Sequence, residues 1–359
     1  MVSSNLLAKS GRKVLLIEKK KYPFHKVCGE YVSNEVLGFL QSIGFNPFDH
    51  GASSINKLRI STPYGRNIYI PLDLGAFGIS RYIMDNALAE LALTAGVEVK
   101  PGVRVTDVLI NTDDYDVQTH EGTYNAGIVI GSYGKRDTLD KKLDRGFIDE
   151  RTGYLGVKHH IRTDYPVDEI GLDSFQNGYC GIVKIEKDLY NLCYLYKRKD
   201  AHKTIEQLQE EVLFRNPVLK EIFHNAEFVF DEPLAINEIS FHYKTISENN
   251  ILMCGDSAGL IAPLCGNGMS MAIQSARLLS ECIIRNSIPR KKHSYHTLKK
   301  IELEYSERWK KQFSLRLKTG RTLQALFGNR LLTASALHLI HAVSPVEKWL
   351  IRNTHGKSY

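Results

Sequence analysis

Several features that would place the chain in a specialised class are scarce in its sequence. Its 359 residues include six cysteines, at positions 28, 180, 193, 254, 265 and 282, and no C-x-x-C pair. This argues against a disulfide scaffold or a zinc site and favours a reducing, cytoplasmic compartment. No apolar run reaches the roughly 18 residues of a membrane-spanning helix, and the N-terminus lacks a signal-peptide pattern. With 43% hydrophobic and 24% charged residues, neither a disordered nor a fibrous chain is expected.

Positive charge is concentrated at the C-terminal end. From Arg285 onward there are 16 Lys and Arg but only 4 Asp and Glu, whereas the whole chain carries +7. Apolar residues at 298, 301, 305, 309, 313 and 317 predict one amphipathic helix, and 331–343 is more uniformly apolar. A basic amphipathic helix favours peripheral contact with an anionic membrane; packing on the protein body with a solvated basic face is the alternative. No motif for nucleic acid accompanies it, and none is expected as partner.

Helix and strand signals predict α/β units at both ends of the chain. Helices are predicted at 2–9, 82–95 and 268–285, and strands at 13–18, 97–105, 126–131 and 251–255. A hairpin is predicted for 57–62 and 66–71, which alternate around Pro-Tyr-Gly. The middle, 151–245, differs, since paired strands at 178–185 and 189–196 and a helix at 204–213 predict an antiparallel sheet with helices on one side.

Glu18 ends the first predicted strand, where an acid that binds the ribose of a dinucleotide is expected. In such a unit a G-x-G-x-x-G turn lies about 20 residues before the acid, and the sequence has no such turn before Glu18. We therefore expect the first strand and its glycine turn to lie upstream of Met1, so that the chain is N-terminally truncated. A surface acid at the end of an ordinary strand is the alternative.

A glycine-rich loop within 254–272 gives the second signal. A buried strand ends at Gly255 and Asp256, glycines follow at 259, 266 and 268, and a helix begins near Met269. Glycines let the backbone approach a ligand closely, and free N–H groups at a helix start point toward it. The pattern predicts a site for an anion or a polar ring, with a plain strand–loop–helix connection as the alternative.

Three motifs together resemble the FAD-dependent oxidoreductases built like p-hydroxybenzoate hydroxylase and geranylgeranyl reductase. The stretch 255–268 matches the flavin motif Gly-Asp-x-Ala-Gly-x-x-x-Pro-x-x-Gly-x-Gly. The stretch 23–30 resembles the Pro-x-x-Lys-x-Cys-Gly-Glu segment of the geranylgeranyl reductase branch, and Arg81, Asp85 and Leu88 fit the Arg-x-x-x-Asp-x-x-Leu helix start. The resemblance covers about residues 2–285 and is specific to the superfamily rather than to one substrate.

The resemblance implies FAD as cofactor, with NAD(P)H or another reductant as electron donor, and a role for each matching residue. It implies that Glu18 binds the adenosine ribose, Arg81 the phosphates or ribityl chain, and the Val105 backbone the adenine. Gly255 and Asp256 would lie by the ribityl or pyrophosphate region, and Cys28 and Gly29 by the ring face. N–H groups of Gly266, Asn267, Gly268 and Met269 would face the pyrimidine edge of the flavin. A buried small residue is the alternative reading of Cys28, and no catalytic residue is assigned.

The sequence departs from the family pattern in three places. The glycine fingerprint is missing, so we expect the chain as written to purify with little or no FAD or to be poorly soluble. Residues 131–134 read Gly-Ser-Tyr-Gly where the family has Gly-Ala-Asp-Gly, so Tyr133 cannot supply the carboxylate. Residues 179–184 read Tyr-Cys-Gly-Ile-Val-Lys in place of Tyr-x-Trp-x-Phe-Pro, which removes support for geranylgeranyl as the substrate and argues against a halogenase.

We therefore expect an α/β protein with a doubly wound, Rossmann-like FAD-binding domain that lacks its first strand. The expected domains are FAD-binding at 1–54, 82–150 and 246–285, substrate-binding at 55–81 and 151–245, and a helical C-terminal region at 286–359. The expected function is reduction of an apolar, prenyl-like or other lipid-like substrate. An FAD-dependent monooxygenase, and a non-catalytic flavin fold that binds lipid or a partner, are the alternatives. His159 and His160 have no third ligand nearby, and no metal is expected.

Overall fold

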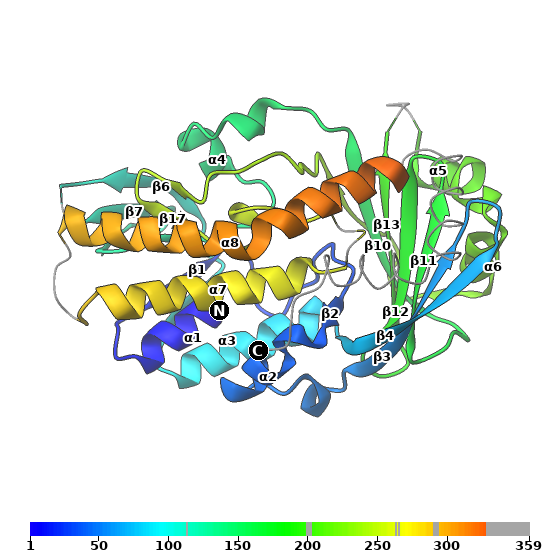
Figure 1. Ribbon diagram of the computed structural model, residues 1–359, viewed down its shortest axis with the longest axis horizontal. Helices are drawn as coiled ribbons and strands as arrows, with labels where there is room; N and C mark the ends of the chain where they lie inside the picture. The colour runs from blue at the N-terminus through cyan, green and yellow to red at the C-terminus, as the bar shows by residue number, and fades with distance from the viewer. Residues whose placement is uncertain (113, 199–202, 263, 265, 290–293, 328–359) are drawn as a thin grey trace.

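The computed structural model describes residues 1–327 except 113, 199–202, 263, 265 and 290–293 (Figure 1). The apolar stretch predicted at 331–343 lies outside these residues. The helices are α1 (Val2–Lys9), α2 (Leu37–Ser42), α3 (Arg81–Thr94), α4 (Thr138–Lys142), α5 (Ile205–Glu211), α6 (Pro217–Asn225), α7 (Gly268–Asn286) and α8 (Tyr295–Phe327).

The strands fall into one large sheet and three small ones. They are β1 (Leu15–Glu18), β2 (Tyr31–Ser33), β3 (Ser53–Ser61), β4 (Asn67–Gly78), β5 (Glu98–Pro101), β6 (Val105–Ile110), β7 (Tyr115–Thr119), β8 (Thr123–Ala126), β9 (Ile130–Gly131), β10 (Tyr154–Arg162), β11 (Glu169–Phe175), β12 (Gly178–Lys184), β13 (Tyr190–Lys197), β14 (Glu227–Phe228), β15 (Leu234–Asn237), β16 (Ser247–Glu248) and β17 (Ile251–Met253).

The large sheet has nine strands in the order β14-β10-β13-β12-β11-β3-β4-β2, with β15 also paired to β10. The β3–β4 hairpin and the antiparallel β12–β13 pair confirm the sequence predictions. The sheet is mixed rather than purely antiparallel, because β3 and β11 run parallel. A long stretch of chain separates these two strands, as a parallel pair requires. The large sheet also extends beyond the predicted substrate domain, because β2, which lies in the predicted FAD-binding domain, pairs with β4.

Helices α5 and α6 pack on one face of the large sheet, as predicted. Leu208, Leu219 and Phe223 from this side share a buried cluster with Ile182 of β12 and Leu192 of β13. The opposite face of the sheet turns toward the parallel strands at the other end of the molecule (Figure 1).

Two separate parallel pairs form the other end of the molecule. β1 pairs with β5, and β9 pairs with β17. Among the described strands, β1 and β9 have no hydrogen-bonded partner on their other sides. The strand predicted at 126–131 was wrong in length: β9 covers only two residues, because Ala126 still belongs to β8, which pairs antiparallel with β7 in a small sheet of its own.

Helix α8 lies alongside α7 (Figure 1), and its apolar face packs on the protein body. The predicted stripe is buried throughout, at Leu298, Ile301, Tyr305, Trp309, Phe313 and Leu317. The Tyr305 hydroxyl donates to the Met253 carbonyl at 2.8 Å, which ties α8 to β17. The amphipathic helix is thus confirmed within the described residues. Lys300, Lys310 and Lys311 are exposed, whereas the apolar stripe is buried. Membrane contact by α8, which stays a prediction, would therefore depend on the charge of these lysines. No helix in the described part of the chain combines the length and apolarity needed to cross a bilayer.

His159 makes the stability of this fold depend on pH. Its ring lies edge-on to Phe223 and Phe228, and burial lowers the pKa of His159 to about 4. Below the ordinary pKa of about 6.5, the unfolded chain binds a proton that the folded protein does not. The free energy of unfolding should therefore fall by roughly 2 kcal/mol between about pH 7 and pH 5 through this residue alone. Urea unfolding of His159→Phe should show a correspondingly weaker pH dependence; an unchanged dependence would contradict the assignment.

Candidate functional site

One continuous cavity of ≈ 1500 Å³ is bounded by strands from both ends of the molecule. Its walls come from β1, the segment 22–31, the start of α3, the loop after β9, the loop 254–269 and one face of the large sheet. Ligand pockets usually measure about 300–1000 Å³. The cavity is therefore large enough for an extended cofactor and a second ligand together.

The structure brings nearly all the predicted cofactor residues to this cavity. Ten of the eleven line it: Glu18, Cys28, Gly29, Arg81, Val105, Gly255, Asp256, Gly266, Gly268 and Met269. Asn267 does not line it; this residue is buried at the N-terminal end of α7. These residues come from five separate parts of the chain, so their convergence is a property of the fold. Their individual roles toward FAD stay predictions.

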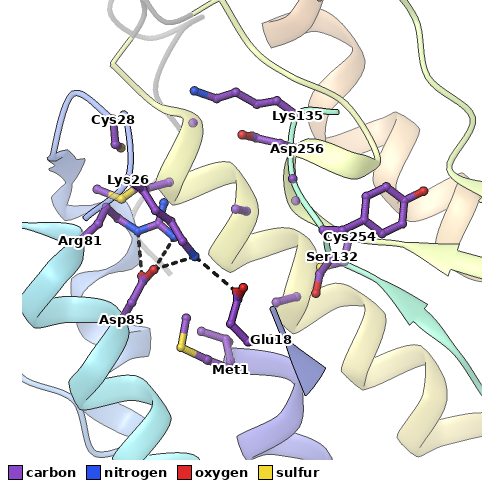
Figure 2. A pocket seen from close by; sticks show the side chains of 18 of the residues that line it. Met1, Glu18, Lys26, Cys28, Arg81, Asp85, Ser132, Lys135, Cys254 and Asp256 are labelled. Carbon is purple, nitrogen blue, oxygen red and sulfur yellow. Dashed lines mark hydrogen bonds and ion pairs between the residues drawn. The ribbon is translucent and has the colours of Figure 1, made fainter. Parts of the chain in front are cut away.

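Lys26, for which the sequence motifs implied no role, forms ion pairs with an acid on either side of it. Figure 2 shows Lys26 between Asp85 and Glu18, with its Nζ 3.0 Å from an Asp85 oxygen and 3.7 Å from a Glu18 oxygen. Arg81 donates twice to Asp85, at 2.7 and 2.8 Å. Burial raises the pKa of Asp85, but Arg81 and then Lys26 lower it by more, so its pKa lies below the ordinary value. Asp85 therefore holds two cations at the cavity wall, where they can meet an anionic ligand.

The glycine-rich loop brings backbone donors to the opposite wall. Gly255 and Gly266 have φ of 64° and 63°, in the left-handed region that favours glycine. A Cβ at Gly266 would lie 3.1 Å from the Tyr31 ring, so the close approach of these two segments also requires glycine. Helix α7 begins at Gly268, and Gly268 and Met269 line the cavity. Its first N–H groups lack intrahelical partners and carry the positive end of the helix dipole.

The loop after β9 carries a buried polar cluster where the family pattern has an aspartate. The Tyr133 hydroxyl lies 3.1 Å from Asp140 and 3.2 Å from Arg145. Burial and Asp140 raise the pKa of Tyr133, so the phenol stays neutral. Arg145 also donates to the carbonyls of Thr245 and Ser257, at 2.8 and 2.9 Å. The cluster therefore ties this loop to the segments around β16 and β17.

A buried ionic cluster lies behind Cys28 and Gly29. Glu30 is fully buried, receives a hydrogen bond from the Lys158 ammonium, and has its Oε2 2.7 Å from His160 Nε2. Burial raises the pKa of Glu30, but Lys158 and His160 lower it by more, so its pKa lies below the ordinary value. Asn191 on β13 donates to the Gly29 carbonyl at 2.9 Å. The segment that contains Gly29 and Glu30 is thus held to the large sheet. The space beside Gly29 is open, because a Cβ there would meet nothing within 4 Å.

The two adjacent histidines serve opposite faces of β10, as the period of a strand requires. His160 faces Glu30, whereas His159 packs against Phe223 and Phe228 under the helices. They cannot share a metal ion. Within the described residues, no group of three His, Cys, Asp or Glu side chains is placed to hold one.

The part of the cavity against the large sheet is apolar. Its side chains include Leu58, Ile60, Leu172, Tyr179, Leu195, Leu260, Ile261 and Leu264. Cys193 also lines it, and burial raises the pKa of Cys193 to about 12, so its thiol adds no charge. We call this part the apolar chamber. Cys28 and Gly29 line the same cavity beside the large sheet, because Asn191 on β13 donates to the Gly29 carbonyl.

The residues present fit a flavin dinucleotide. An acid, two cations, the first turns of α1 and α7 and an acidic glycine loop surround the charged part, while the apolar chamber opens beside them. A Cβ at Gly29 or at Gly134 would meet nothing within 4 Å. Contacts within the protein therefore do not explain the glycines, and the space beside them is open. Glu18, Arg81, Lys26, Asp256 and the start of α7 are the groups that would hold the cofactor.

Sequence patterns alone did not indicate the roles of Lys26, Lys158 and His160 at this site. Lys158 and His160 are two residues apart in β10, so the period of a strand places both side chains on one face of the sheet. Their acidic partner could not be found from spacing, because Glu30 lies 128 residues from Lys158 in the sequence.

Comparisons with known proteins bear on the family and the fold of the chain. No protein-family model matches the chain. Conditioned medium factor receptor 1 of Dictyostelium discoideum is 24% identical over 348 residues, which is 86% of this chain and 66% of that protein, just under two thirds of its length. Digeranylgeranylglycerophospholipid reductase of Methanococcus vannielii is 25% identical over 354 residues, covering 92% of this chain and 85% of that one.

The fold is also found in flavin-dependent enzymes of known structure. The flavin-dependent brominase Bmp2 superposes with a TM-score of 0.79 at 16% identity, over 98% of this chain and 89% of that one. At this identity the likeness concerns the fold. The chain therefore has the fold of the FAD-dependent oxidoreductases and is a distant homologue of the digeranylgeranylglycerophospholipid reductases.

Proposed function

We propose that the protein is an FAD-dependent reductase that adds two hydrogens to a carbon–carbon double bond of an apolar, prenyl-like lipid. The apolar chamber is the observation that supports this most. It adjoins the predicted position of the flavin ring at Cys28 and Gly29, and its walls offer hydrocarbon, the Tyr179 ring and one neutral thiol. A charged or strongly polar substrate would lose its hydration there without replacement.

Bound FAD would supply the hydride chemistry, and the protein would bind and orient it. Glu18 would accept hydrogen bonds from the adenosine ribose. Arg81, Lys26 and the helix starts would hold the phosphates, since cations and helix N-termini both favour anions. Backbone N–H groups of Gly266, Gly268 and Met269, which line the cavity, would face the pyrimidine edge, where negative charge develops on reduction. NAD(P)H or another reductant would supply the electrons.

The large sheet would hold the substrate and exclude water. Leu172, Leu195 and Ile60 present a continuous apolar surface toward the cavity. The Glu30 cluster fixes Gly29 against this sheet, so the distance between the cofactor part and the apolar chamber is set by buried ionic contacts rather than by a free loop. Glu30 and Lys158 are therefore positioning residues in this proposal.

Anaerobic turnover tests the proposed reaction. FAD-loaded protein of full natural length is reduced chemically and mixed without oxygen with a phospholipid that carries geranylgeranyl chains. We expect the absorbance of oxidised flavin to return while mass spectrometry shows a lipid with two additional hydrogens. A product that forms only with oxygen and contains an added oxygen atom would instead identify a monooxygenase. Lipid that binds but is unchanged under both conditions would identify a non-catalytic binding protein.

Asp256 gives a direct test of the cofactor site. It is the carboxylate of the glycine loop and lines the cavity. Loss of a charge-assisted hydrogen bond costs about 1.5–3 kcal/mol. In the protein of full natural length, Asp256→Ala should therefore weaken FAD binding by roughly tenfold or more in a calorimetric titration. Asp188→Ala, at an exposed turn on the large sheet, serves as control and should bind FAD normally. Equal affinities in the wild type and Asp256→Ala would mean that the loop is only structural.

A further inference from the structure

The centre of the chamber floor is hollow, because two neighbouring positions of the large sheet carry small residues. Gly181 on β12 and Cys193 on β13 are direct partners in the antiparallel register, and both line the cavity. Leu172 on β11 is the partner of Gly181 on the other side. Larger side chains at Tyr179 and Leu195 stand along the same two strands. The floor thus has a depression with an apolar rim.

The fold itself does not require glycine at 181. A Cβ there would meet only the carbonyl oxygens of Cys193 and Gly171, both at 3.8 Å, which is ordinary van der Waals contact. Two other glycines of the sheet are different: a Cβ at Gly171 would lie 2.6 Å from Arg59, and one at Gly178 would lie 2.2 Å from the Leu195 carbonyl. Those two are demanded by packing, whereas Gly181 is not.

A glycine inside a strand weakens the strand, and it often marks a place where a ligand approaches the backbone closely. Gly181 sits in the middle of a sheet whose neighbouring strands pair on both sides. Since protein packing does not explain it, the space that it leaves is available to whatever occupies the chamber.

We propose that Gly181 determines which apolar substrates the protein accepts, by admitting a ring-bearing isoprenoid rather than only a single chain. This inference rests on the proposed function for the location of the substrate. The hollow is bordered by Leu172, Tyr179 and Leu195, and the neutral Cys193 thiol forms its floor beside Gly181. A hydrocarbon ring, which is wider than a prenyl chain, can lie in it, whereas an acyclic prenyl chain, whose branches are single methyl groups, does not need it.

Two alcohols with the same number of carbons separate these possibilities. All-trans-retinol carries a substituted ring, whereas geranylgeraniol is acyclic. Binding is measured by equilibrium dialysis against each alcohol, with oxidised, FAD-loaded protein. We expect the wild type to bind both, and Gly181→Trp to weaken retinol binding by about tenfold or more while geranylgeraniol binding changes by less than about threefold.

Two variants check that the effect comes from the hollow. Cys193→Leu fills the same space from the next strand and should also weaken retinol binding selectively, which keeps the test decisive if Gly181→Trp does not fold. Gly146→Trp adds the same indole at an exposed site where a Cβ meets nothing within 4 Å, and it should leave both affinities unchanged. Unaltered retinol binding in the folded variants, equal weakening of both alcohols, or a wild type that binds neither would overturn the inference.

This experiment is independent of the proposed reaction. Binding to oxidised protein requires no electron transfer. A protein that discriminates between the two alcohols yet reduces no double bond would keep the specificity role of Gly181 and refute the reductase. A protein that reduces prenyl lipid yet shows no selective effect at Gly181 would support the reductase and refute the specificity role of Gly181.

Discussion

Replacing Lys158 with Met should lower the free energy of unfolding by about 3–5 kcal/mol, because it leaves the Glu30 carboxylate buried without its ammonium partner. Both side chains are fully buried, and the pair joins the segment 23–30 to β10. Thermal or urea unfolding of the purified variant measures this loss. A loss below about 1 kcal/mol would show that the pair is not desolvated as the structure describes.

A double variant separates the cost of an unpaired charge from the worth of the pair. Glu30→Gln combined with Lys158→Met removes both charges, and it should recover a large part of the stability lost in Lys158→Met. The exposed Arg162–Asp188 pair on the same sheet is the control. Removing Asp188 should have little measurable effect on unfolding, since exposed pairs are screened by water and salt.

The Glu30 cluster also determines how the free energy of unfolding changes as the pH falls. The pKa of Glu30 in the folded protein lies below the ordinary value of 4.5. Its contribution is therefore complete above about pH 4.5 and is lost as the pH falls through the folded pKa. The Lys158→Met variant, in which the ammonium no longer lowers the pKa of Glu30, should lose less stability over that acidic range than the wild type.

Replacing Arg145 with Met is the second change for which we expect a loss of about 3–5 kcal/mol. Arg145 is 3% exposed and donates to Asp140 and to the carbonyls of Thr245 and Ser257. Its loss leaves the Asp140 charge buried and frees the loop 132–137, which lines the cavity. We expect both a lower unfolding midpoint and weaker FAD binding.

Arg285→Met is the matched control for this prediction. Arg285 is also an arginine paired with an acid, Glu304, but its side chain is 63% exposed. Its replacement should change neither the unfolding midpoint nor the affinity for FAD appreciably. If Arg145→Met behaves like Arg285→Met in both measurements, the buried cluster does not organise the cavity wall.

Local patterns in the sequence predicted the elements whose structure depends on near neighbours. The β3–β4 hairpin follows from alternation on both sides of a Pro-Tyr-Gly turn, and α7 follows from the glycine loop before it and the period of its apolar residues. β9 was predicted too long, because the apolar run at 126–131 does not reveal where the chain leaves β8 and enters the parallel pair.

Contacts between distant segments could not be predicted in this way. The parallel β3–β11 pair joins strands from distant parts of the chain, and no local pattern indicates its register. The cofactor residues were found because the glycine loop, Glu18 and Arg81 belong to recognisable motifs. Lys26 belongs to the 23–30 motif, but the motif does not reveal its partner, and Lys158 belongs to no motif. Their partners are the acids Asp85 and Glu30, which only the fold brings beside them.

A crystal structure of the full-length protein with bound FAD tests the central claim most directly. The account predicts the adenosine ribose on Glu18, the phosphates near Arg81 and the start of α7, and the flavin ring between the 266–269 backbone and Cys28–Gly29, with one face open to the apolar chamber. A flavin ring that lies away from the chamber, or a cavity that stays without FAD in crystals grown in saturating cofactor, would contradict it.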